Sequence, residues 1–102
     1  MNTVVESRKE ELEALCNKRH VTRLELFGSA AGVDVKIKPN NLDFLVEFAS
    51  STPEAHADRY FSLKEDLEAL FGVSVDLVEA KAMKNPYFVR RVNESRTLIH
   101  AA

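Results

Sequence analysis

The sequence predicts an α+β (α/β-like) fold in which a small mixed β-sheet is packed with helices. Helical and β-prone segments alternate along the chain, in the order helix, strand, connector, strand, helix, strand, helix. This alternation is typical of helices layered on a sheet. The chain has 102 residues, which suits one domain, and no linker, repeat or low-complexity stretch divides it. We therefore expect residues 1–102 to form a single domain.

The first helix is expected from Thr3 to about Arg19. Its apolar residues fall near one face, acidic residues concentrate in its first half, and basic residues close it, which matches the helix dipole. Cys16 lies on the apolar face. We predict that Cys16 is a small core residue rather than a reactive thiol.

Two strands follow the first helix. Residues 21–27 (VTRLELF) alternate leucines with charged residues, as a short strand does. Residues 30–40 form a connector in which Gly32 and Pro39 act as breakers. Residues 42–48 (LDFLVEF) are apolar except for two acids, which indicates a central strand covered on both faces.

The second helix and the third strand have clear boundaries. Thr52 supplies a capping hydroxyl, and Pro53 follows at the first helical position. An apolar stripe runs from there to Gly72, a typical helix-ending residue. Residues 73–79 (VSVDLVE) then read as the third strand.

The last helix opens at Asn85–Pro86, and residues 97–102 are either a short strand or a loose tail. The expected inner positions of this helix are Tyr87, Phe88 and Val92. Three nearby arginines are expected on a solvated helix face rather than against an acidic partner or a phosphate: Arg90, Arg91 and Arg96.

Composition and charge exclude several classes of protein. With 45% apolar and 29% charged residues, the chain is unlike a disordered one. Its 14 basic and 16 acidic residues give no strong nucleic-acid-binding footprint. One cysteine permits no intrachain disulfide, which fits a reducing compartment. The acidic N-terminus lacks a signal-peptide core and no apolar run approaches membrane length, so we expect a cytoplasmic protein with no membrane partner.

Three features of the predicted strands carry candidate chemistry. Gly28 and Ser29 directly follow the first strand, where a glycine permits a tight turn and the serine can donate a hydroxyl and an amide to phosphate. Asp43 stands in an otherwise apolar strand, where a carboxylate costs free energy unless it is paired, hydrogen-bonded or bound to a cation. Asp76 interrupts the third strand in the same way, although a solvated strand face would also explain it.

A metal site is one interpretation of these acids. Carboxylates two residues apart on a strand point the same way and can bind one magnesium ion. Two residues before Asp43 stands Asn41, which is not an acid. Its amide oxygen can ligate magnesium, but it brings no negative charge and cannot act as a base.

The stretch LFGSAAGVDVKIKPNNLDFLVEF, residues 26–48, resembles the signature of the minimal nucleotidyltransferases of the DNA polymerase β-like superfamily. These proteins usually read Leu-Phe-Gly-Ser, two variable residues, Arg-Gly, and then an Asp-x-Asp that ends in Leu-Val-Glu-Phe. Residues 75–102 are similar to the family's third-carboxylate strand and C-terminal segment. The resemblance covers about Leu24 to Ala102 and implies the nucleotidyltransferase fold.

The resemblance assigns roles to four residues. Gly28 and Ser29 match the pair that contacts the nucleotide phosphates, Asp43 matches the second metal carboxylate, and Asp76 matches the third acid. In active members this third acid acts on the attacking hydroxyl or completes the metal site. The metal set implied for this chain is thus Asn41, Asp43 and Asp76.

The chain departs from the family pattern at three positions. Asn41 stands where the first aspartate belongs, Gly32 where the arginine aligns, and Val33 where the second glycine aligns. These are the positions that hold metal and phosphate, so the resemblance supports the fold better than the activity.

The resemblance implies a nucleotidyltransferase that moves AMP from ATP to a hydroxyl with Mg²⁺ as cofactor. The implied acceptor is a tyrosine of a partner HEPN-domain protein, with this chain as the antitoxin. The alternative is a catalytically weakened or inactive member that binds and neutralises its HEPN partner, and Asn41 favours this alternative. A purely structural domain would leave Asp43 and Asp76 as unexplained costs. Homo-oligomerisation stays open.

Overall fold

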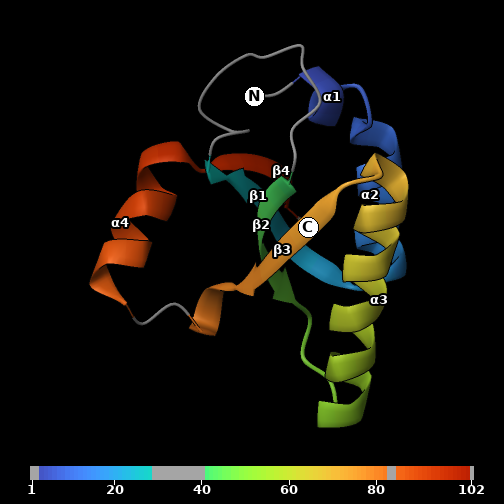
Figure 1. Cartoon of the computed structure of the whole chain (residues 1–102). Helices are drawn as coiled ribbons and strands as arrows, with labels where there is room; N and C mark the ends of the chain where they lie inside the picture. Colours follow the sequence, from blue (N-terminus) through green and yellow to red (C-terminus); the bar gives the residue numbers. More distant parts are fainter. Residues whose placement is uncertain (1–2, 29–40, 83–84, 102) are drawn as a thin grey trace.

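The computed structural model describes residues 3–28, 41–82 and 85–101. A four-stranded mixed sheet in the order β3-β2-β1-β4 lies at its centre (Figure 1). The strands are β1 (Val21–Phe27), β2 (Asn41–Phe48), β3 (Ser74–Glu79) and β4 (Thr97–Ala101). β1 runs antiparallel to β2 and to β4, whereas β2 and β3 are parallel. The predicted α+β class with a mixed sheet is confirmed, and the tail forms the edge strand β4.

The N-terminal helix is shorter than predicted. The expected helix from Thr3 to about Arg19 is divided into α1 (Thr3–Glu6) and α2 (Lys9–Lys18). The break falls at Ser7, whose hydroxyl donates a hydrogen bond of 2.8 Å to the carbonyl of Val4. A serine that bonds its own backbone in this way competes with the helical pattern, which explains the interruption.

The helix α3 (Pro53–Phe71) begins and ends as its sequence predicts. The Thr52 side chain accepts a hydrogen bond of 3.2 Å from the amide of Ala55 at the N-terminus. Gly72 ends the helix with a φ of 67°, and its amide donates to the carbonyl of Glu68 at 2.7 Å. Neither α3 nor any other helix within the described ranges is long and apolar enough to cross a membrane.

The main core lies between the sheet and the helices α2 and α3, which lie together on one side of it (Figure 1). Cys16 is fully buried there, as predicted, and burial raises the pKa of its thiol to about 12. Such a thiol stays protonated and unreactive. The buried residues of this core are Val5, Leu12, Cys16, Val21, Leu24, Leu26, Leu42, Phe44, Val46, Leu63, Leu67, Phe71, Val75, Leu77 and Ile99.

Side chains of α3 cover the outer edge of β3. The hydroxyl of Tyr60 donates to the carbonyl of Leu77 at 2.5 Å. The amide of Val75 donates to Oε2 of Glu68 at 3.0 Å. Backbone groups of an edge strand are otherwise a template for pairing with another chain. α3 therefore satisfies part of the edge on which the candidate site lies.

The helix α4 (Pro86–Ser95) lies on the opposite side of the sheet from α2 and α3 (Figure 1). A short 3₁₀ helix, Ala80–Ala82, precedes it. The prediction that Tyr87 is an inner residue is wrong, because its exposed fraction is 78%. Tyr87 lies in the first turn, which begins away from the sheet (Figure 1). The side chains of the other two predicted inner residues, Phe88 and Val92, lie outside what the structure describes.

An ion-pair cluster around the buried Glu25 connects β1 to the segment between α4 and β4. Glu25 is only 2% exposed, so the burial of β1 does not follow the predicted alternation of leucines with charged residues. Arg96 forms a bidentate pair with it, with Nε–Oε2 and Nη2–Oε1 distances of 2.5 and 2.6 Å. Arg23 adds a third bond, of 2.7 Å from its Nε to Oε1. Arg96 is solvent-exposed, as expected, but it lies just beyond the end of α4 rather than on its face, and it pairs with Glu25 because a buried carboxylate requires cationic partners.

The pKa of Glu25 is lowered from 4.5 to about 2, first by the hydrogen bonds from Arg96 and then by those from Arg23. The folded state thus holds this carboxylate charged where the unfolded chain takes up a proton. Its contribution to stability is complete above about pH 4.5 and is lost as the pH falls from there to about 2.

We predict that Glu25→Gln lowers the free energy of unfolding at pH 7 by about 2 kcal/mol, because the buried Glu25 loses its charge-assisted hydrogen bonds to two guanidinium groups that are themselves partly exposed. Urea unfolding at pH 7 and at pH 3 measures the effect. The difference between wild type and variant should shrink at pH 3. Glu65→Gln, on the exposed face of α3, is the control and should change little. An equal difference at both pH values would contradict the assignment.

Candidate functional site

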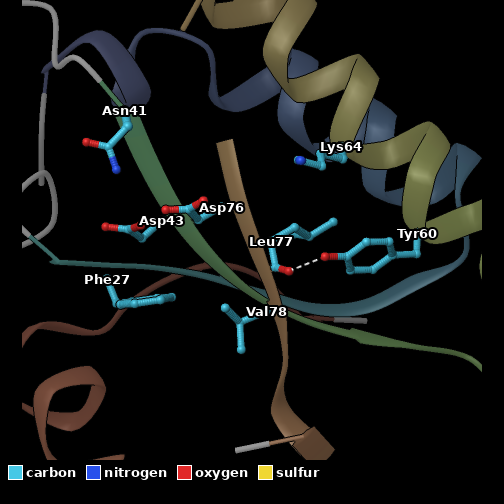
Figure 2. Close-up of a pocket in the computed structure, with 8 residues that line it drawn as sticks. All are labelled: Phe27, Asn41, Asp43, Tyr60, Lys64, Asp76, Leu77 and Val78. Carbon is cyan, nitrogen blue, oxygen red and sulfur yellow. Dashed lines mark hydrogen bonds between the residues drawn. The ribbon is translucent and has the colours of Figure 1, made fainter. Parts of the chain in front are cut away.

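The predicted site residues of β2 and β3 share one pocket of ≈ 480 Å³ at the β3 side of the sheet (Figure 2). Its lining combines acids, an amide, a lysine and a tyrosine with apolar side chains. The lining residues are Phe27, Asn41, Asp43, Tyr60, Lys64, Asp76, Leu77 and Val78.

Asp43 and Asp76 are direct partners in the register of the parallel pair β2–β3. Leu42 and Phe44, on either side of Asp43, are fully buried in the main core, so Asp43 faces the other side of the sheet. Figure 2 shows the two carboxylates next to each other and pointing the same way. Two acids that the sequence separates by more than thirty positions are therefore neighbours in space.

Asn41 extends this pair along β2. It lies two residues before Asp43 on the same strand, so both side chains project from the same face. Asn41 is exposed, and its side chain lies on the same side as the two carboxylates (Figure 2). The three residues of the predicted metal set thus line one pocket.

Gly28 approaches the Asp43 carboxylate more closely than any other residue type could. Its φ is +79°, in the left-handed region that favours glycine. A Cβ atom built on Gly28 would lie 2.5 Å from Oδ2 of Asp43, well inside van der Waals contact. The backbone at Gly28 is thus packed against the acid itself. Ser29, Gly32 and Val33 lie outside the described residues.

Two lining residues come from α3 and were not assigned to the site from the sequence. Tyr60 was predicted only as part of the apolar stripe, and Lys64 was not singled out. Burial raises the pKa of Tyr60, and the negative charges of Glu79 and Asp76 add to this. The i, i+4 spacing of Tyr60 and Lys64 puts them on one helix face. This spacing is the sequence feature from which their joint position in the site could be predicted.

The donor set fits a hard, oxygen-preferring cation. Magnesium is usually bound through one or two carboxylates, with waters and substrate phosphates completing its shell. Asp43 and Asp76 supply two carboxylates, and Asn41 can add an amide oxygen. Among the described residues, no group of three or more His, Cys, Asp or Glu side chains could hold a metal ion. Asn41, Asp43 and Asp76 are thus the described residues of this pocket that could contribute oxygen ligands to such a cation.

Comparison with known families now identifies the class of protein. Residues 8–99 match the model of the nucleotidyltransferase domain. Because the match spans most of the chain, this protein belongs to the nucleotidyltransferase domain family. Membership supports a transferase.

Two candidate protein adenylyltransferases of Methanocaldococcus jannaschii are similar to this chain over most of their length. One is 33% identical over 97 residues, which cover 92% of this chain and 95% of the relative. The other is 29% identical over 94 residues, with 92% of both chains covered.

Solved structures confirm the predicted nucleotidyltransferase fold and the resemblance to minimal nucleotidyltransferases. A candidate minimal nucleotidyltransferase matches with a TM-score of 0.62 and 29% identity, over 91% of this chain and 90% of that one. A toxin-antitoxin complex with AMP-PNP matches with a TM-score of 0.67 and 16% identity, over 92% and 73% of the two chains. A complex of a tri-AMPylated Shewanella oneidensis HEPN toxin with its MNT antitoxin gives 0.64 and 15%, over 95% and 72%. At these identities the last two establish the fold alone.

We predict that Gly28→Ala displaces the Asp43 carboxylate and also costs about 1 kcal/mol of stability, because alanine disfavours a positive φ. Binding of Mn²⁺, used as a paramagnetic substitute for magnesium, should weaken by about tenfold or more. Gly72→Ala is the matched control, since Gly72 has a similar φ of +67° but does not line the pocket. It should lose similar stability in urea and keep its Mn²⁺ affinity. Equal Mn²⁺ affinities in the two variants would refute the role of Gly28.

Proposed function

We propose that this chain transfers AMP from ATP, with magnesium, to the hydroxyl of a tyrosine on a HEPN-domain partner, and that it acts as the antitoxin of that partner. The similarity to candidate protein adenylyltransferases supports a protein acceptor. The solved complex of an AMPylated HEPN toxin with an MNT antitoxin supports the choice of partner. The complex with AMP-PNP supports an adenine nucleotide.

The observation that carries the proposal is the pairing of Asp43 with Asp76 against the backbone of Gly28, which we call the glycine turn. The two carboxylates lie in register on β2 and β3, and the Gly28 backbone lies against one of them. A glycine beside an acid pair lets a phosphate and a cation approach the same point. A solvated strand face has no need for this close approach, so the arrangement favours a nucleotide site.

The proposed reaction assigns a part to each residue. The acceptor oxygen bonds to the α-phosphorus of ATP while the bond from that phosphorus to the bridging oxygen breaks, and pyrophosphate leaves. Asp76 takes the proton of the acceptor hydroxyl. Asp43 and Asp76 would hold the magnesium ion, with Asn41 as a neutral ligand. When bound, this ion neutralises charge on the phosphates.

A second candidate function is binding of the HEPN partner without catalysis. Asn41 favours it, because an amide replaces one of the negative charges that would hold the cation. The exposed position of Asn41 beside Asp43 leaves the cation partly solvated, which weakens its binding further. Under this proposal the same face would still contact the partner.

We predict that Asp43→Ala abolishes transfer of label from [α-³²P]ATP to the HEPN-domain partner. The expected loss is about 100- to 1000-fold or more, because a group that stabilises the transition state is removed. Glu47→Ala is the control: it removes an exposed acid four residues along the same strand, outside the pocket. No transfer by the wild type, with tight partner binding retained in Asp43→Ala, would establish the binding function instead.

The variant Asn41→Asp tests whether the absence of the first carboxylate limits magnesium binding and AMP transfer at this site. A restored carboxylate should tighten magnesium binding and raise the transfer rate, because it adds a charged ligand beside Asp43. The transfer assay and a magnesium titration measure both effects. Asn17→Asp, on the exposed surface of α2, makes the same charge change elsewhere and should have no effect. If Asn41→Asp changes neither quantity, the loss of the first carboxylate does not limit the site.

A further inference from the structure

We propose that Lys64 selects the acceptor: its ammonium group pairs with an acidic side chain next to the acceptor tyrosine, at the edge of the sheet formed by β3. The inference rests on the proposed function for the identity of the acceptor. Its geometric basis is the position of Lys64 relative to the acid pair and the glycine turn.

Gly28 and Lys64 flank the acid pair from opposite sides. Gly28 ends β1, and its neighbour Phe27 pairs with Asp43 across β1 and β2. Asp76 lies on the other side of Asp43, on the edge strand β3. Lys64 reaches this edge from α3, and its ammonium group points toward the Asp76 side of the pocket (Figure 2).

This order across the sheet separates the two substrates. The glycine turn is the part of the site suited to the nucleotide phosphates, and it lies on the β1 side of Asp43. In phosphoryl-type transfer the attacking and leaving oxygens are roughly in line, on opposite sides of the phosphorus. With the leaving pyrophosphate toward Gly28, the acceptor oxygen must arrive from the side of Asp76. Lys64 lies on this acceptor side.

The ammonium of Lys64 is available for an incoming group. Within the described part of the chain it has no carboxylate within 4.0 Å and no hydrogen bond. Its helix is fixed on both sides of it, since Leu63 and Leu67 are fully buried. A cation held at a pocket mouth by a rigid helix favours an anionic partner and disfavours a cationic one.

Pairing of the acceptor segment with the backbone of β3 is disfavoured at the middle of this strand, so recognition depends on side chains such as Lys64. Two backbone groups at the outer edge, the Leu77 carbonyl and the Val75 amide, already bond to Tyr60 and Glu68. An acceptor segment that added there as a further strand would have to displace both bonds. Phe61, 62% exposed beside Tyr60, offers apolar contact on the same helix. The favoured acceptor segment thus has an acidic residue next to its tyrosine.

Two synthetic peptides test the inference. They have equal length and one central tyrosine, flanked by glutamates in one and by glutamines in the other. With labelled ATP and magnesium, the wild type should favour the glutamate peptide by roughly two- to fivefold in kcat/KM, the range of an exposed ion pair. The preference should appear in the KM for the peptide, with the KM for ATP unchanged.

Charge-reversal variants show whether Lys64 causes the preference. Lys64→Glu should reverse it, Lys64→Met should abolish it, and Lys64→Arg should keep it. Lys18→Glu, an equal charge change on the exposed surface of α2, should leave it intact. A Lys64→Met variant that raises the KM for ATP alone would overturn the inference, because Lys64 would then serve the phosphates.

Binding measured without chemistry separates this inference from the proposed function. Titration of the ¹⁵N-labelled chain with each peptide gives two dissociation constants by NMR. A preference for the glutamate peptide that follows the charge at Lys64, without any AMP transfer, would support the inference and reject the catalytic function. AMP transfer with no preference between the two peptides would support the catalytic function and reject the inference about Lys64. Failure to bind either peptide would also overturn the inference.

Discussion

The parallel pairing of β2 with β3 is the constraint on which the candidate site depends. Only this pairing brings Asp43 next to Asp76, because a shift of one residue would turn one of the acids into the main core. The helix α3 makes the pairing possible: it connects the two strands, fills the core with Leu63 and Leu67, and bonds the outer edge of β3 through Tyr60. The same helix thus builds the fold and supplies one wall of the pocket.

The charge balance of the site follows from what this pairing brings together. The described lining of the pocket contains two carboxylates and one ammonium group, with Asn41 as a neutral oxygen donor. Such a set holds a divalent cation less strongly than three carboxylates would, and it depends more on ligand phosphates to complete the shell. Under the proposed function, a nucleotide and magnesium would accordingly bind together rather than in succession. Membership in the nucleotidyltransferase domain family agrees with a site of this kind.

The ion-pair cluster of Glu25 with Arg96 and Arg23 lies on the same side of the sheet as the pocket acids and stabilises a buried carboxylate. Glu25 is almost completely buried, and Arg96 and Arg23 hold it in its charged form. The pair fixes the segment between α4 and β4 to β1. The two groups of acids therefore differ in position: Glu25 is buried between two arginines, whereas Asp43 and Asp76 line an open pocket that Lys64 also lines.

The sequence by itself determined the element order, the caps of α3, the core position of Cys16 and the family signature at Gly28 and Asp43. These are local properties, since periodicity, capping and turn chemistry act over a few residues. Tertiary structure alone decided the register of Asp43 against Asp76, the contact of Gly28 with the acid, the entry of Lys64 into the pocket and the burial of Glu25. Each of these joins distant segments, and strand register and helix placement are set by the packing of the whole core.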